Sequence, residues 1–419
     1  MSFRRVAANA TWLTLNQALS YVLPLVTTPI LTRGFGPETY GTYSTALAYG
    51  AYAALLVTYG FNFYGPRAIS LSRDDPEELR RLYAAIMAVQ SVIAVAVLAF
   101  FGLLLLVIDV ERAAIAIFII LVAQAAVVAA SPVWLFAGLQ DLRNVSLAQF
   151  VGRLALFAFT VAVVDRPADL LPLAAAMLAT ACAILAYSLR EARRIIGRAF
   201  PLRQDVVRHV VADAAPFFWS SLAVSVYASS SIIIVSAVLG PGAVGYFALA
   251  DKIRVAAVSL SAPITQAVYP FFNQLAQAKT QTSGDVRVRR AFVWAMLALS
   301  GTSSIAMFWL APEIIRLLGG RGFDPAILLL RIMAPVPLMI ALSNIVGRQT
   351  LIPYGHIRLF TTVTFAAAVL GVISIAIFLY LFGLPGAAWS GLLVESFVTV
   401  AMVAAVARRG LLRRAFAVE

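Results

Sequence analysis

The sequence predicts an all-α polytopic membrane protein, with about 12 transmembrane helices in two parallel six-helix lobes around a central cavity. Three observations support this fold class: long apolar stretches, basic residues in alternate loops, and an internal repeat. The 419 residues are 62% hydrophobic and only 12% charged. Because lipid offers the backbone no hydrogen-bond partners, each apolar stretch is expected to be a helix. The predicted spans are 7–32, 40–63, 82–107, 112–137, 145–164, 170–190, 213–239, 244–273, 290–310, 325–350, 358–382 and 386–407.

Basic residues collect in every second connection between the predicted spans. When the N-terminus and the even-numbered connections are assigned to the cytoplasm, those segments hold 22 of the 32 basic residues, and the outer connections hold five. This asymmetry is the positive-inside signal, so we expect both termini to be cytoplasmic. The net charge of +13 lies in short juxtamembrane loops, which favours anionic membrane lipids and not nucleic acid as partners.

Several enzyme classes are excluded by what the loops lack. The largest connection, 190–212, is too short for a separate catalytic domain. Neither Lys252 nor Lys279 belongs to a glycine-rich phosphate loop. His209 and His356 lie in separate loops, where they cannot form a metal cluster. We therefore expect a transporter that is not an enzyme and has no cofactor or metal, with a purely structural membrane protein as the alternative.

A short motif recurs at about half the length of the chain. Residues 36–43 join the first two spans, residues 240–247 join the seventh and eighth, and Gly, Pro and Gly coincide at an offset of 204. Glycine ends one helix and proline begins the next. Six spans per half give both halves the same orientation, with the substrate path between them. This repeat predicts an N-terminal lobe of residues 1–200 and a C-terminal lobe of residues 201–419.

Charged residues within apolar spans are costly, so they indicate a cavity or a partner. Arg153 lies about nine residues into the fifth span, with Gln149 one turn before it on the same helix face. Asp251, Lys252 and Arg254 form a cluster in the eighth span. Asp251 and Arg254 are spaced to pair, which leaves Lys252 without a local partner.

The excess of basic over acidic residues in these helices predicts a cationic cavity. Such a cavity suits an anionic substrate, and the arginine fork suits phosphate in particular. For each residue, a structural ion pair or a snorkelling end is the alternative. The candidate substrate-binding residues are Arg33, Arg67, Arg153, Lys252 and Arg254.

Glu395 is an isolated carboxylate near the middle of the twelfth span. It could change its protonation state as the cavity opens and closes, which makes it a candidate for ion coupling. Asp251 is the second candidate, although Arg254 can pair with it. For Glu395, a hydrogen bond that holds neighbouring helices together is the alternative.

Three segments of the chain resemble bacterial polysaccharide flippases of the Wzx type. The segments are residues 21–43; Gly60-Phe61-Asn62 followed by Arg67-Ala68-Ile69; and Trp134-Leu135-Phe136-Ala137-Gly138-Leu139-Gln140-Asp141. In the third segment, Ala137 stands where the family usually has glutamine.

This resemblance implies membership of the multidrug/oligosaccharidyl-lipid/polysaccharide exporter superfamily. It implies a multi-pass protein of the bacterial inner (cytoplasmic) membrane that flips undecaprenyl-pyrophosphate-linked oligosaccharide units by alternating access, for O-antigen or exopolysaccharide synthesis. The partners would be the lipid-linked oligosaccharide and membrane lipids, and could include the polysaccharide polymerase machinery.

Three alternatives remain open at this point. A drug/cation antiporter of the same superfamily would have acidic residues in its cavity, whereas basic residues predominate here. A lipid II flippase usually has about two more helices. A non-transporting membrane assembly protein would export no glycan.

Overall fold

The computed structural model describes residues 3–107, 112–197, 202–277 and 282–416. All regular secondary structure in these ranges is helical, as the sequence predicts. The chain divides into two compact parts, which we call the N-terminal unit (Met1–Ser225) and the C-terminal unit (Val226–Glu419). The boundary between them falls inside one long helix, α8 (Gln204–Ser259).

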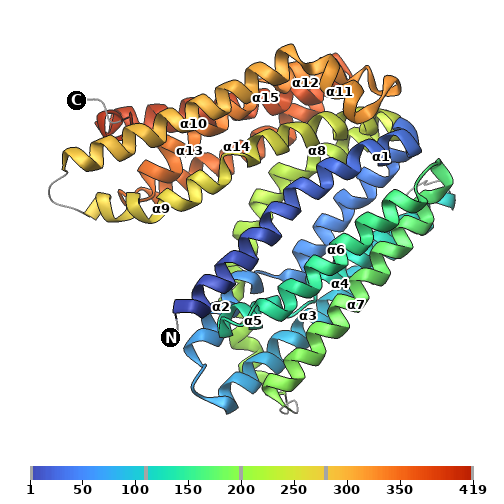
Figure 1. Ribbon diagram of the computed structural model, residues 1–419, viewed down its shortest axis with the longest axis vertical. Helices are drawn as coiled ribbons and strands as arrows, with labels where there is room; N and C mark the ends of the chain where they lie inside the picture. Colours follow the sequence, from blue (N-terminus) through green and yellow to red (C-terminus); the bar gives the residue numbers. More distant parts are fainter. Residues whose placement is uncertain (1–2, 108–111, 198–201, 278–281, 417–419) are drawn as a thin grey trace. The chain divides into compact units, whose positions relative to one another are not determined.

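The N-terminal unit is a bundle of long helices with two short helices, α2 and α5, that pack against each other. Helices α4 and α6 each pack against both α1 and α7 (Figure 1). The elements are α1 (Phe3–Thr58), α2 (Phe61–Leu71), α3 (Pro76–Val107), α4 (Arg112–Ala129), α5 (Val133–Leu139), α6 (Arg143–Val163), η1 (Pro167–Asp169), α7 (Leu170–Ile196) and the first part of α8.

One core cluster of this unit joins the short helices to α3, α7 and the start of α8. Trp134 of α5 and Phe61 of α2 are buried in it, together with Ile86 of α3 and Ala214 of α8. Since all of these side chains are almost fully inaccessible, the positions of α2 and α5 are fixed by packing.

In the C-terminal unit, α14 and α15 pack along each other, and α13 packs against α10 and α15 (Figure 1). Helix α12 also packs against α15. The remaining elements are the rest of α8, α9 (Ala262–Gln277), α10 (Ser283–Trp309), α11 (Ala311–Gly319), η2 (Arg321–Phe323), α12 (Ala326–Met333), α13 (Val336–Val346), the π-helical turn η3 (Gly347–Leu351), α14 (Ile357–Phe382), α15 (Leu384–Arg408) and α16 (Leu412–Phe416).

The two Gly-Pro joints of the sequence repeat have the same backbone conformation. Gly36 interrupts α1 with φ 70° and ψ 177°, and Gly240 interrupts α8 with φ 78° and ψ 179°. Only glycine adopts this region readily. Helical structure continues on both sides of each glycine, so α1 and α8, each counted across its joint, are 56 residues long. The helix joint that the repeated motif predicts is therefore confirmed in both halves.

Nine helical segments within the described ranges are long and apolar enough to cross a membrane. They are 76–104, 114–139, 143–163, 167–196, 230–266, 283–309, 326–351, 357–382 and 384–408. The chain is thus an all-helical polytopic membrane protein. The full count of twelve, which adds spans at 7–32, 40–63 and 213–239, stays a prediction.

Four of the predicted spans are not single unbroken helices, and proline accompanies the break in three of them. In 112–137, α4 ends at Ala129 and α5 begins after Pro132; in 325–350, α12 ends before Pro335. Predicted span 244–273 breaks at residues 260–261, just before Pro263 of α9. Proline lacks the N–H that an unbroken helix needs, so each of these three breaks has a local cause. The fourth break is in predicted span 40–63, where α1 ends at Thr58 and α2 begins at Phe61, and both residues between them have positive φ.

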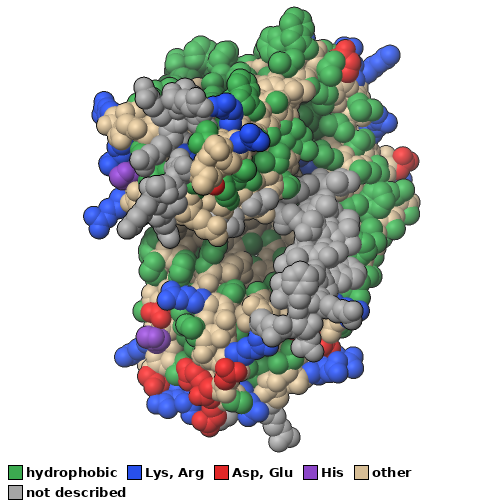
Figure 2. Space-filling view, turned by 60° about the vertical axis from the view of Figure 1, so that its left-hand side comes forward, with side chains coloured by type: hydrophobic (Ala, Val, Ile, Leu, Met, Phe, Trp, Pro, Cys, Tyr) green, Lys and Arg blue, Asp and Glu red, His purple; other side chains and the backbone are tan. Residues whose placement is uncertain are grey.

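Large apolar side chains cover much of the surface of the candidate spans. On α3, Val92 and Leu103 are exposed, and on α14 so are Phe365 and Tyr380. Figure 2 shows broad hydrophobic areas on the molecular surface, with charged side chains gathered in groups. A surface of this kind is expected where lipid replaces water around the helices.

Candidate functional site

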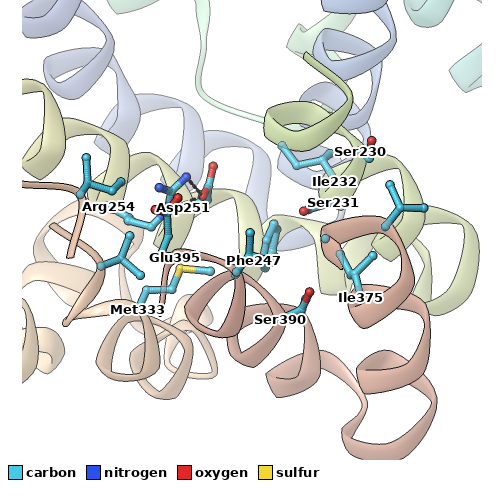
Figure 3. Close-up of a pocket in the computed structure, with 17 residues that line it drawn as sticks. Ser230, Ser231, Ile232, Phe247, Asp251, Arg254, Met333, Ile375, Ser390 and Glu395 are labelled. Carbon is cyan, nitrogen blue, oxygen red and sulfur yellow. Dashed lines mark hydrogen bonds and ion pairs between the residues drawn. The ribbon is translucent and has the colours of Figure 1, made fainter. Parts of the chain in front are cut away.

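A pocket of about 210 Å³ lies inside the C-terminal unit, between α8, α12, α13, α14 and α15 (Figure 3). Most of its lining is apolar, as expected within membrane-spanning helices. The polar side chains of the lining come from α8 and α15. They are Ser230, Ser231, Asp251, Arg254, Ser390 and Glu395.

Asp251 and Arg254 form an ion pair one turn apart on α8. Arg254 donates from Nη2 and from Nε to the same carboxylate oxygen, Asp251 Oδ1, at 2.7 and 2.8 Å. Both side chains are largely buried. The pair predicted from the three-residue spacing is therefore confirmed.

Glu395 reaches the same pocket from α15 and is only 8% exposed. Figure 3 shows its side chain beside the Asp251–Arg254 pair. The pocket thus holds two carboxylates and one guanidinium, which leaves an excess of negative charge when all three are ionised. In that charge state the arrangement favours a proton or another cation over an anion. The structure brings the two predicted ion-coupling residues together in one site.

Lys252 follows Asp251 in the sequence but is not among the pocket-lining residues. Its side chain is partly buried, and no hydrogen bond or ion pair engages it within the part of the chain that the structure describes. The sequence anticipated this separation, because successive residues of a helix point about 100° apart.

Arg153 belongs to a second pocket, of about 250 Å³, inside the N-terminal unit. Helices α4, α6 and α7 form it, and Gln149 lines it one turn before Arg153 on α6, as the sequence predicted. In contrast to the pocket of Asp251 and Glu395, its described lining has no carboxylate.

Arg33 and Arg67 are exposed side chains at other positions of the N-terminal unit. Arg33 lies on α1, three residues before the joint at Gly36, and Arg67 lies on α2. Neither is among the residues that line the two pockets. Their role in substrate binding therefore stays a prediction.

The motif segments around Arg67 and Trp134 are the helices α2 and α5, which pack against each other. A Cβ atom added at Gly65 would lie 2.9 Å from Trp134, and one added at Gly138 would lie 2.6 Å from Ile69. Gly138 of the third motif, and Gly65 between the two parts of the second, are thus needed for close packing, and they fix the helix that carries Arg67.

Sequence reasoning missed Gln90, a polar side chain that is fully buried on α3. Its Oε1 accepts the indole N–H of Trp134 at 3.1 Å, and its Nε2 donates to the carbonyl of Ala129 at 3.3 Å. A lone glutamine within an apolar span was the available signal, since buried polar groups in lipid require partners.

Arg289 was also missed, because the sequence prediction counted it among the basic loop residues. It is 3% exposed on α10, with its guanidinium 5.2 Å from the ring centre of Phe272. Thr282 and Asp285 form a capping box that starts α10. That spacing is a recognisable helix-start signal, and it would have placed Arg289 inside the helix.

Comparison with known proteins assigns the chain to a family. The family model described as "Polysaccharide biosynthesis protein" matches residues 6–276. The chain belongs to the polysaccharide biosynthesis protein family. It is 29% identical over 416 residues to a protein of Escherichia coli (strain K12) named "Putative O-antigen transporter", and this alignment covers 98% of each chain. A Shigella dysenteriae protein of the same name is 26% identical and covers 92% of this chain and 96% of its own.

Solved structures show the fold of this family member. The lipid II flippase MurJ matches with a TM-score of 0.76 at 12% identity, over 94% of this chain and 87% of MurJ. A multidrug resistance MATE family transporter of the MOP superfamily matches with a TM-score of 0.70 at 15% identity, over 94% and 95% of the two chains. The predicted resemblance is therefore confirmed, and the protein is a member of a transporter family, not an enzyme.

Proposed function

We propose that this protein flips undecaprenyl-pyrophosphate-linked oligosaccharide units from the inner to the outer leaflet of the bacterial cytoplasmic membrane. The family, the two relatives named as O-antigen transporters, and the MATE/MurJ-like fold support this proposal. The observation that carries it is a pair of polar pockets inside apolar helices. Basic charge predominates in one and acidic charge in the other.

The proposed mechanism is alternating access by two lobes, residues 1–200 and 201–419, with six spans each and both termini in the cytoplasm. The asymmetry of the basic loops supports the orientation. The shared conformation at Gly36 and Gly240 supports the repeat on which the two-lobe mechanism depends.

The negative charge of the pyrophosphate requires positive side chains within the membrane. The candidates are Arg33, Arg67, Arg153, Lys252 and Arg254. Lys252 suits this role because it is a partly buried cation outside any ion pair in the described part of the chain. Arg254 differs, because Asp251 already holds its guanidinium.

The ion pair between Asp251 and Arg254 gives a route for coupling transport to a cation gradient. Protonation of Asp251 or Glu395 would remove negative charge from the pocket and weaken the hold on Arg254. The guanidinium would then be able to turn toward a phosphate oxygen. Release of the proton would restore the pair with Asp251. In this scheme the two carboxylates are the ion-coupling residues.

The test is leaflet-resolved export of a lipid-linked glycan in a bacterial strain that lacks its own flippase. Cells that produce the chain should display the glycan on the outer leaflet, and cells with an empty vector should retain it inside. Full export after alanine replacement of Arg153, Lys252 and Arg254 together would contradict their assigned role. Extrusion of cationic drugs without glycan export would favour an antiporter. Absence of both activities would favour a membrane assembly protein.

A further inference from the structure

The pocket of the N-terminal unit combines polar groups from three helices at a depth where lipid surrounds the protein. Its polar lining residues are Gln124, Ser131, Gln149, Arg153 and Thr180. Thr180 is already satisfied, because its hydroxyl donates to the carbonyl of Ala176 at 2.8 Å. The other four come from α4, the turn that follows it, and α6.

The charge of this pocket is positive. Arg153 is the charged residue of its described lining, and no carboxylate accompanies it there. An arginine side chain offers five N–H donors and no acceptor, and each glutamine amide adds two donors. The lining therefore favours a ligand that is negatively charged and rich in acceptor oxygens.

Arg153 lies deep within its helix. Helix α6 has 21 residues, which corresponds to about 31 Å, close to the thickness of the hydrocarbon core. Arg153 occupies the middle of α6. Its guanidinium therefore does not easily reach the headgroup region beyond either end of the helix. An arginine at this depth is costly and is expected to serve a polar cavity.

Ser131 gives independent support for a ligand. It is 7% exposed, it lines the pocket, and its Oγ has no hydrogen-bond partner among the described residues. Buried serine hydroxyls in helical proteins commonly donate to a backbone carbonyl three or four residues earlier. An unpaired buried hydroxyl is energetically unfavourable. The Ser131 hydroxyl is available to donate to an oxygen of a bound molecule, and that hydrogen bond would remove this cost.

Close helix packing holds the pocket in shape. A Cβ atom added at Gly152 would lie 2.8 Å from the side chain of Ile184 and 3.1 Å from that of Thr180. Gly152 thus lets α6 lie directly on α7 beside Arg153. Gln124, Gln149 and Arg153 are presented by packed helices, and Ser131 lies in the short turn between α4 and α5, which favours a built binding site.

We propose that this pocket binds the phosphate of a membrane lipid, with Arg153 and Ser131 as its principal donors and Gln124 and Gln149 beside them. The arginine fork pairs with two phosphate oxygens, and the serine hydroxyl donates to a third. This inference rests on the proposed flippase function, since a lipid-linked pyrophosphate in transit would supply the phosphate at this depth. A resident anionic phospholipid offers the same chemistry, and the experiment separates the two.

The experiment uses the full chain purified in detergent and equilibrium binding of farnesyl diphosphate, with farnesol as the probe without phosphate. Phosphatidylglycerol is titrated in parallel, with diacylglycerol as its neutral counterpart. Arg153→Gln should weaken farnesyl diphosphate binding by about tenfold or more, as loss of a charged hydrogen-bond donor does. Ser131→Ala should weaken it by roughly twofold to tenfold. Arg153→Lys keeps the charge and should retain more binding than Arg153→Gln.

Ser188→Ala is the matched control. Ser188 is also fully buried in the N-terminal unit with an Oγ that has no partner in the described chain, but it does not line the pocket. Unchanged binding in Ser188→Ala, with losses in the two pocket variants, supports the site. Equal binding of farnesol, unchanged binding in Arg153→Gln, or an equal loss in Ser188→Ala would overturn it. Binding of phosphatidylglycerol alone supports the site with a resident lipid as the source.

The same variants distinguish this inference from the proposed function. If the parent exports no glycan but the pocket variants still lose phosphate binding, the flippase proposal fails and the phosphate site stands. If the parent exports glycan and the pocket variants bind the probe as the parent does, the site fails and the flippase proposal stands.

Discussion

Gly138 of α5 lies directly against Ile69 of α2. A Cβ atom at Gly138 would come within 2.6 Å of the Cβ of Ile69 and within 2.9 Å of the carbonyl oxygen of Pro66. The reverse contact exists one turn away, where Gly65 of α2 lies against Trp134 of α5. Two short helices therefore meet with a glycine on each side, and the motif residues that resemble the flippase family have a packing reason to be present.

Replacement of Gly138 by alanine should destabilise the protein. The added methyl group cannot be accommodated without moving α5 from α2, and overpacking of this kind costs about 1–3 kcal/mol. Thermal unfolding of the purified variant in detergent measures the effect. Gly102→Ala is the control, because nothing lies within 4 Å of a Cβ added at that helical position. It should be neutral or slightly stabilising. A control as unstable as Gly138→Ala would contradict the packing argument.

Trp134→Phe should also destabilise the N-terminal unit, through a lost hydrogen bond. Phenylalanine fills most of the space but leaves the buried Oε1 of Gln90 without the indole donor, at a cost of about 1–3 kcal/mol. Trp309→Phe serves as the comparison because Trp309 is exposed on α10. Equal melting temperatures for the two variants would show that the Gln90 bond contributes nothing measurable.

Gly36→Ala and Gly240→Ala should have similar effects, because the two glycines share one backbone conformation. A side chain in this region of φ and ψ costs about 1–3 kcal/mol. Each variant should unfold at a lower temperature and export less glycan. Gly242→Ala is the matched control, since Gly242 has no positive φ and no neighbour within 4 Å of an added Cβ. A large difference between Gly36→Ala and Gly240→Ala would count against equivalent joints in the two halves.

The sequence alone predicted those features that depend on local spacing. Helical spans follow from apolar length, the joints at Gly36 and Gly240 follow from the Gly-Pro motif, and the ion pair of Asp251 and Arg254 follows from their three-residue separation. Each of these features depends on residues that are close together in the sequence. Pro132 and Pro335 signal the interruptions of two spans, but a prediction that uses apolar length alone does not detect them.

Features that depend on tertiary packing were beyond the sequence. Glu395 and Asp251 share a pocket only because α15 packs within reach of α8, and no spacing rule relates two such distant residues. The burial of Arg289 depends on the position of Phe272 on another helix. Gln149 and Arg153 were paired correctly on one face of α6, yet Gln124 and Ser131 joined them only through the packing of a different helix.

The orientation of the chain can be tested by labelling single cysteines in a Cys182→Ser background. Ala168 and Gln204 are exposed positions in connections that the basic-residue asymmetry assigns to opposite sides of the membrane. A membrane-impermeant maleimide added to intact cells with a permeable outer membrane should label Ala168→Cys and spare Gln204→Cys. Labelling of both should appear once the inner membrane is opened. The reverse pattern would overturn the orientation.

The coupling role of Glu395 predicts a specific loss in Glu395→Gln. Glutamine keeps the size of the side chain and its capacity to hydrogen-bond within the pocket, but it cannot bind and release a proton. Membrane vesicles that contain the parent should move the lipid-linked glycan faster under an imposed pH gradient, and Glu395→Gln vesicles should not respond to the gradient. The variant should still be folded, because the buried site on α15 loses a charge and not its shape.

Asp251→Asn provides the comparison for this test. That change removes the ion pair with Arg254 and leaves a largely buried guanidinium without its carboxylate, so it should lower thermal stability as well as transport. Glu395→Gln should lower the response to the gradient with little change in stability, and this contrast separates a proton site from a structural pair. If the parent ignores the gradient, or if Glu395→Gln responds to it as the parent does, Glu395 is not the proton site. Its burial then serves the packing of α15 against its neighbours.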